Sequence, residues 1–178
     1  MKVWIFGDSF AASTDSKSWV NLLQEKFEVH QFATNGSSEY RIWKTYQQQK
    51  NSIGINDCVL FCHTSPYRLF LKNTETMLSR LLPSHPYCDL IINDILTKKE
   101  SKFIKVLNTI WDEDYFNDTY NLLVKELYDV PNSLHFTFFE TDALMSFYQT
   151  WTKNKGHINH MTAEGNKIIF KQIKKWLE

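Results

Sequence analysis

The sequence contains little of what marks several common classes of protein. Three cysteines in 178 residues are too few for a disulfide framework, which favours a reducing, cytoplasmic environment. No apolar run approaches the ~18 residues of a membrane-spanning helix, and no basic-then-apolar leader is present. The 20 basic and 20 acidic side chains give zero net charge, which argues against binding nucleic acid through bulk positive charge. We therefore expect a cytoplasmic protein with no membrane insertion and no nucleic-acid partner.

Phosphate loops and metal-ligand clusters are also missing from the sequence. The first strand-like segment is not followed by a glycine-rich loop, which argues against a nucleotide-binding fingerprint. His157 and His160 form an HxxH pair, but no cluster of Glu, His or Cys completes a zinc site. Cys58 and Cys62 lie in an apolar segment and are interpreted as buried thiols. We expect neither a metal nor an organic cofactor.

The composition that remains is that of one globular domain. Hydrophobic residues make up 43% and charged residues 22%, both ordinary for a soluble globular protein. A chain of 178 residues can bury a sizeable core, and no repeat, low-complexity tract or linker divides it. Residues 1–178 are therefore predicted to form a single domain, with most of the abundant aromatic residues in its core.

The hydrophobic pattern predicts alternating strands and helices. Strands are expected over 2–6, 28–33, 57–62 and 134–139, and helices over 16–27, from Ser37 or Ser38 to about 50, over 101–128 (long or broken), 141–151 and 162–177. This order indicates parallel βαβ units, because parallel strands need a crossover such as a helix. Residues 64–100 contain three prolines and are interpreted as a lid or pocket wall outside the sheet, and 151–159 as a loop.

Polar residues gather where the predicted strands end. Sites of open parallel sheets form beyond the carboxyl ends of the strands. A hydroxyl nucleophile needs a base about 3 Å away and donors aimed at the developing oxyanion. The sequence supplies such groups at three strand ends and before the last helix: Gly7-Asp8-Ser9, Asn35-Gly36-Ser37, His63-Thr64-Ser65 and His160.

These motifs resemble those of the GDSL-type esterases and lipases of the SGNH hydrolase superfamily, in the family's order along most of the chain. GDSF at residues 7–10 matches the first block, which holds the nucleophile, here Ser9. Gly36 matches the second block, whose glycine N–H donates to the oxyanion hole. HMTAEGN at residues 160–166 is similar to the last block, in which the catalytic histidine, here His160, precedes the closing helix.

The resemblance implies a fold and an activity. The expected fold is a three-layer α/β/α sandwich, SGNH- or flavodoxin-like, whose central, mainly parallel sheet has about four to five strands. The expected activity is serine-dependent hydrolysis of a small-molecule or glycan ester. The alternative is an SGNH-like binding or assembly module that has kept the pocket and lost the chemistry.

The third block departs from the family's pattern. The family has Gly-x-Asn-Asp after the third strand, and the Asn side chain donates to the oxyanion. CHTS at residues 62–65 stands here instead. Thr64 is the best substitute and Ser65 the second, because a hydroxyl can donate one hydrogen bond.

The acid of the family's triad is also absent. The family places Asp three residues before its histidine, where this chain has His157. An imidazole can orient His160, but it offers no fixed negative charge to the imidazolium. Three outcomes stay open: a Ser–His dyad, a carboxylate recruited from Asp142 or Glu164, and loss of catalysis.

Three neighbouring polar residues receive less specific predictions. Asp8 is expected to bond backbone groups within its own turn. His63 is expected to pack at the end of its strand. Arg68 follows Pro66 and is predicted either to bind an anionic part of the substrate or to be a solvated loop arginine.

Overall fold

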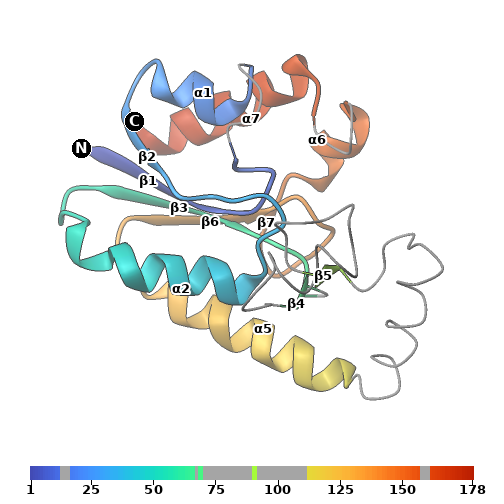
Figure 1. Cartoon of the computed structure of the whole chain (residues 1–178). Helices are drawn as coiled ribbons and strands as arrows, with labels where there is room; N and C mark the ends of the chain where they lie inside the picture. Colours follow the sequence, from blue (N-terminus) through green and yellow to red (C-terminus); the bar gives the residue numbers. More distant parts are fainter. Residues whose placement is uncertain (13–16, 67, 70–89, 92–111, 157–160) are drawn as a thin grey trace, which may run out of the picture.

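The computed structural model describes residues 1–12, 17–66, 68–69, 90–91, 112–156 and 161–178 (Figure 1). Among these residues, five parallel strands form a central sheet in the spatial order β2-β1-β3-β6-β7. Their bounds are β1 Lys2–Gly7, β2 Glu28–Gln31, β3 Cys58–His63, β6 Ser133–Thr137 and β7 Met145–Ser146. Two short strands, β4 (Arg68–Leu69) and β5 (Leu90–Ile91), form a separate antiparallel pair.

Helices cover both faces of the sheet and give the molecule its layers (Figure 1). On one face α1 (Trp19–Gln24) packs against α7 (Ala163–Leu177), and α6 (Tyr148–Lys153) lies beside α7. On the other face α2 (Glu39–Gln49), which continues into the 3₁₀ helix η1 (Lys50–Ser52), packs against α5 (Glu113–Tyr128). The α/β fold class expected from the sequence is confirmed. None of the described helices is long and apolar enough to cross a membrane.

Strand β1 lies in the middle of the core because its side chains are apolar on both faces. Val3 and Ile5 belong to the hydrophobic cluster that contains Trp19 of α1. Trp4 and Phe6 belong to the cluster on the opposite face, under α2. Full burial of a side chain of this size stabilises a fold by roughly 1.5–3 kcal/mol. The alternation places β1 between two helical layers.

Side-chain caps start four of the helices. Ser18, Ser38, Asp112 and Thr162 stand just before α1, α2, α5 and α7, and each accepts a hydrogen bond from a backbone N–H of the first turn. Such caps satisfy donors that have no partner within the helix. The capping role predicted for Ser38 is confirmed.

The segment 141–151 differs from the single helix predicted for it. It contains the edge strand β7, and α6 begins only at Tyr148. Phe147 is 3% exposed, and its N–H donates to Thr137 O at 2.8 Å, which extends the ladder between β6 and β7. Both residues of β7 are exposed, so the strand has no alternating hydrophobic pattern from which it could be predicted.

The other elements agree with their predictions apart from their ends. Helix α1 is shorter than 16–27, and β2 and β6 end two residues before the predicted boundaries. The helix predicted over 101–128 is described from Glu113 onwards, and most of it before that residue lies outside the described residues. Of the lid or wall predicted over 64–100, residues 67 and 70–89 and 92–100 lie outside them too, as does Cys88.

The strand order of the sheet reverses between β1 and β3. After β1 the chain passes to β2 on one side, and β3 then returns to the other side of β1. In open α/β sheets ligands bind where the strand order reverses, outside the carboxyl ends of the two strands. Here these ends are Gly7 of β1 and His63 of β3. The residues that follow them are therefore the candidates for a ligand-binding site.

Candidate active site

The turn after β1 requires glycine at its first position. A Cβ atom on Gly7 would lie 2.7 Å from Cys62 Cβ and 2.9 Å from Ala11 Cβ. The chain then turns tightly, and Ala11 N donates to Asp8 O at 3.0 Å. Ser9 lies in this turn and is half-buried. The close approach of β1 and β3 thus brings Ser9 to the place where the strand order reverses.

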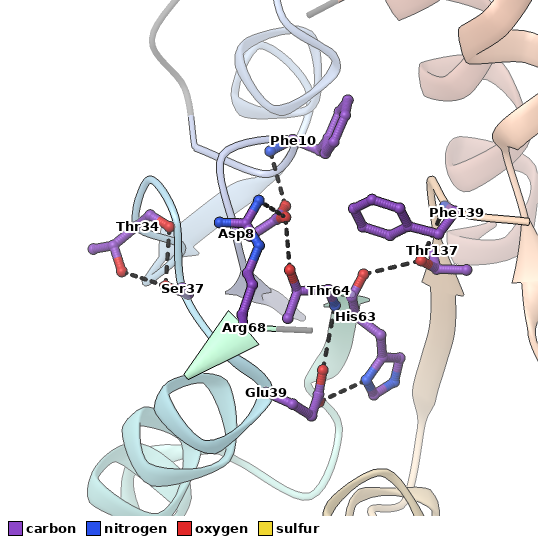
Figure 2. A network of polar contacts seen from close by, with 10 residues as sticks. All are labelled: Asp8, Phe10, Thr34, Ser37, Glu39, His63, Thr64, Arg68, Thr137 and Phe139. Carbon is purple, nitrogen blue, oxygen red and sulfur yellow. Dashed lines mark hydrogen bonds and ion pairs between the residues drawn. The ribbon is translucent and has the colours of Figure 1, made fainter. Parts of the chain in front are cut away.

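The Asp8 side chain points toward Thr64 and Arg68 (Figure 2). It is fully buried; Oδ1 accepts a hydrogen bond from Phe10 N at 3.0 Å, and Oδ2 accepts one from the Thr64 hydroxyl at 3.0 Å. Burial raises the pKa of Asp8, and the Arg68 guanidinium and these two hydrogen bonds oppose that rise. The bond to Phe10 confirms the predicted turn-shaping role, and Thr64 extends it across to β3.

Arg68 is not a solvated loop arginine. Its side chain is 8% exposed, and Nη2 lies 3.7 Å from Asp8 Oδ2, a buried ion pair (Figure 2). Its Nε is buried and has no hydrogen-bond partner in the part of the chain that the structure describes. A guanidinium with one unused N–H beside the Ser9 turn is compatible with binding an anionic substrate group, which stays a prediction.

Thr64 is engaged with Asp8 rather than free. It is 1% exposed, and its hydroxyl donates to the Asp8 carboxylate at 3.0 Å. A hydroxyl has a single proton to donate. Thr64 can therefore serve an oxyanion, as the sequence predicts, only by giving up its bond to Asp8.

The turn that contains Gly36 lies against the end of β1. Thr34 N donates to Gly7 O at 3.1 Å, and the Ser37 hydroxyl donates to Thr34 O at 2.9 Å. Gly36 is buried and has φ 70°, a left-handed conformation that favours glycine. The turn after β2 is thereby fixed beside the turn that carries Ser9.

The two predicted histidines, His157 and His160, lie outside the described residues. Both ends of their segment are described. Lys155 and Met161 form an antiparallel bridge, so the chain leaves and re-enters the described structure at one point. The described residues on either side of 157–160 are thus held together.

Two side chains connect that point to the Ser9 turn. Asn166 Nδ2 donates to Met161 O at 3.3 Å, and Asn166 Oδ1 accepts from Trp19 N at 3.0 Å. The indole Nε1 of Trp19 then donates to Phe10 O at 2.8 Å. Asn166 is 6% exposed and Trp19 is fully buried. A chain of buried and partly buried hydrogen bonds therefore connects Met161 to Phe10 through Asn166 and Trp19.

Replacing Asn166 with Ala should destabilise the protein by about 2–4 kcal/mol, because it leaves buried Trp19 N and Met161 O without partners. The measurement is the free energy of unfolding in urea. Asn121→Ala, at an exposed position inside α5, is the matched control and should stay within about 0.5 kcal/mol of the parent. Equal stabilities of the two variants would contradict the structural role of Asn166.

A second polar network lies on the α2 face of the sheet. His63 Nδ1 lies 2.8 Å from Glu39 Oε1, and His63 Nε2 lies 2.9 Å from His135 Nδ1 (Figure 2 shows Glu39 and His63). His135 Nε2 lies 2.8 Å from the Ser133 hydroxyl. His63 is fully buried and Glu39 is 4% exposed. His63 is packed at its strand end as predicted.

Sequence reasoning missed Glu39, His135, Asn166 and the polar role of Trp19. One signal was available: His135 is a polar residue at an inward position of the apolar segment 134–139, where it needs a partner. The partners themselves could not be read from the sequence, because Asn166 and Trp19 are 147 residues apart.

No group of three or more His, Cys, Asp or Glu side chains that could hold a metal ion occurs among the described residues. Of the three cysteines, Cys62 is buried, and burial raises the pKa of its thiol. Cys58 is only partly buried. The prediction of a buried thiol is thus confirmed for Cys62.

Of the comparisons with known proteins, the one with solved structures gives matches. No protein-family model matches the chain, and no curated protein matches it. Among solved structures it is similar to the crystal structure of a member of the lipolytic protein G-D-S-L family from Veillonella parvula DSM 2008. The two are 13% identical, with a TM-score of 0.47 over 98% of this chain and 97% of that one. Functional roles must therefore be argued from the residues of this chain.

Proposed function

We propose that this protein is a serine-dependent ester hydrolase. Ser9 is the nucleophile and His160 the general base. The backbone N–H groups of Ser9 and Gly36 donate to the oxyanion, and Thr64 joins them if its hydroxyl turns from Asp8. No metal or organic cofactor takes part in this scheme.

One observation supports the pairing of Ser9 with His160 above all others. Phe10 follows Ser9 in the chain, and Met161 follows His160. Hydrogen bonds through Trp19 and Asn166 connect Phe10 with Met161. Two segments about 150 residues apart are thus linked through Trp19 and Asn166. A nucleophile and its base must be held near one another, and this link between the segments that carry them supports the pairing.

The reaction follows from these roles. Ser9 Oγ attacks the acyl carbon while His160 takes its proton, and the carbonyl oxygen becomes an oxyanion that the N–H groups stabilise. His160 returns the proton to the departing alcohol, which leaves an acyl-serine. Water, deprotonated by His160, then releases the acid and restores Ser9. His157 is proposed to orient the His160 ring, because an unheld imidazole samples unproductive tautomers and rotamers.

The proposed substrate is a small-molecule or glycan ester. Arg68 is proposed to bind an anionic part of it. The guanidinium lies next to Asp8, whose neighbour in the chain is the nucleophile, so a substrate anion there would place its ester close to Ser9.

A non-catalytic binding module is the second candidate. The observation that favours it is the commitment of the Thr64 hydroxyl to Asp8, which leaves two backbone donors for the oxyanion. The loss of one oxyanion donor costs roughly 10²–10³ in turnover in serine hydrolases. A site of this kind can retain a ligand after its chemistry has become slow.

Covalent labelling separates the two candidates. We expect a fluorophosphonate probe to label the folded protein at one residue, Ser9, identified by mass spectrometry of the modified peptide. Ser9→Ala should not be labelled, whereas Ser52→Ala, which removes an exposed hydroxyl in η1, should be labelled normally. Failure of the folded parent protein to react would favour the binding module.

A further inference from the structure

Glu39 occupies an unusual position for a carboxylate. It is the first residue of α2, directly behind the Gly36 turn, and its side chain is almost fully buried at the end of β3. Both carboxylate oxygens are used: Oε1 lies 2.8 Å from His63 Nδ1, and Oε2 accepts from Thr64 N at 3.2 Å. Burying a carboxylate costs free energy unless its oxygens accept hydrogen bonds, so the contacts to His63 and Thr64 are needed to keep Glu39 buried.

The donors and acceptors of the network can be assigned in order. The Ser133 hydroxyl donates to Val130 O at 2.7 Å and therefore accepts from His135 Nε2. Burial, helped by His63, lowers the pKa of His135 to about 3, so its ring is neutral and its Nδ1 accepts from His63 Nε2. One proton then lies between His63 Nδ1 and Glu39. Each of the four side chains, from Ser133 through His135 and His63 to Glu39, thus has a hydrogen-bond partner, and these bonds hold the Glu39 carboxylate in place.

We propose that Glu39 is a positioning residue for the turn that presents Ser9, an inference that rests on the hydrolase function proposed above. Glu39 holds the main chain of Thr64, the Thr64 hydroxyl donates to Asp8, and Asp8 accepts from Phe10 N. The path from the buried carboxylate to the nucleophile's turn contains three hydrogen bonds and no gap (Figure 2).

The same residue ties the proposed oxyanion donor into the assembly. Gly36 lies three residues before Glu39, and the Gly36 turn is bonded to the end of β1 through Thr34 N. Glu39 thereby joins the turns that follow β1, β2 and β3, which carry the nucleophile and the donors. A displacement of about 1 Å within such a set can lower turnover on the order of 100-fold.

Two conservative variants of Glu39 distinguish the effect of its side-chain length from the effect of its charge. Glu39→Gln keeps the length of the side chain: its oxygen can accept from Thr64 N, and its amide can donate to His63 Nδ1. Glu39→Asp keeps the charge but is one methylene too short to hold both partners. If Glu39 acts by position, Glu39→Gln should retain most of the turnover of a soluble aryl ester. Glu39→Asp should lose kcat on the order of 100-fold with KM nearly unchanged.

A second measurement does not depend on catalysis. Hydrogen exchange of the Phe10 amide should accelerate severalfold in Glu39→Asp and stay near the parent rate in Glu39→Gln. The Leu60 amide, inside β3, is the reference and should change in neither. If Glu39→Asp does not fold, Thr64→Val cuts the same path one step later and should accelerate exchange at Phe10, whereas Thr64→Ser should not.

The outcomes are separable. Parent-like kcat and Phe10 exchange in folded Glu39→Asp would overturn the positioning role, and so would a large loss of kcat in Glu39→Gln, which would point to charge. Parent-like exchange at Phe10 in Thr64→Val would overturn it as well. If the parent protein hydrolyses no ester but the exchange pattern is as expected, the proposed hydrolase function is refuted, whereas the positioning of the Ser9 turn by Glu39 is supported.

Discussion

Ser9→Ala should reduce ester hydrolysis to the uncatalysed background, a loss of at least about 10⁴-fold in kcat if the parent is an efficient hydrolase. No other hydroxyl lies in the turn after β1 at the reversal of strand order within the described residues. Release of nitrophenol from a short-chain ester is the measurement. Ser52→Ala, at an exposed position in η1, is the matched control and should retain activity. Parent-like hydrolysis by Ser9→Ala would show that the nucleophile is another residue.

The partner of Ser9 has its own signature in the pH profile. If neutral His160 is the base, kcat should rise through one step near the ordinary histidine pKa of about 6.5. His157, unlike a carboxylate, adds no negative charge that would displace this step upward. His160→Ala should lose most activity and the step with it. The double variant with Ser9→Ala should be little worse than Ser9→Ala alone, because nucleophile and base act as a unit.

The second large effect is a loss of stability in acid caused by His135. Burial lowers the pKa of its imidazole from 6.5 to about 3, and the neighbouring His63 adds to this shift. Because the folded pKa is depressed, the unfolded chain binds the proton more readily between these two values. Stability from this group is present above pH 6.5 and is lost as pH falls, by up to about 1.4 kcal/mol per pH unit.

The test compares the unfolding free energies of the parent and His135→Gln between pH 7 and 4.5. Glutamine does not titrate, and it can accept from His63 and donate to Ser133 in place of the ring, so the variant should lose stability less steeply. His30→Gln, at the histidine that bonds to exposed Glu28, is the matched control and should keep the steep parental slope. Identical slopes for the parent and His135→Gln would show that His135 is not held neutral.

Local sequence patterns determined most of the architecture. The strand β1 and the helix α7 begin and end within a residue of the predicted bounds, since their hydrophobic periods are regular and Thr162 caps α7. The polar turns at Ser9, Gly36 and Thr64 were predicted to share one edge because parallel strands end on the same side of a sheet. Each of these inferences needs only neighbouring residues and a rule about topology.

Tertiary structure alone decided which groups the polar side chains would meet. Thr64 was predicted to donate to an oxyanion, and Arg68 either to bind a substrate anion or to be solvated. Tertiary structure brings both side chains to Asp8, from which Thr64 is 56 residues distant. The edge strand β7 was missed because its exposed residues carry no period, and its pairing with β6 is made by backbone groups. A buried carboxylate is stable only where donors converge on it, and that convergence depends on how distant segments pack. Hydrophobic periodicity specifies which faces of helices and strands are buried, but it does not determine which distant polar groups form hydrogen bonds across the core.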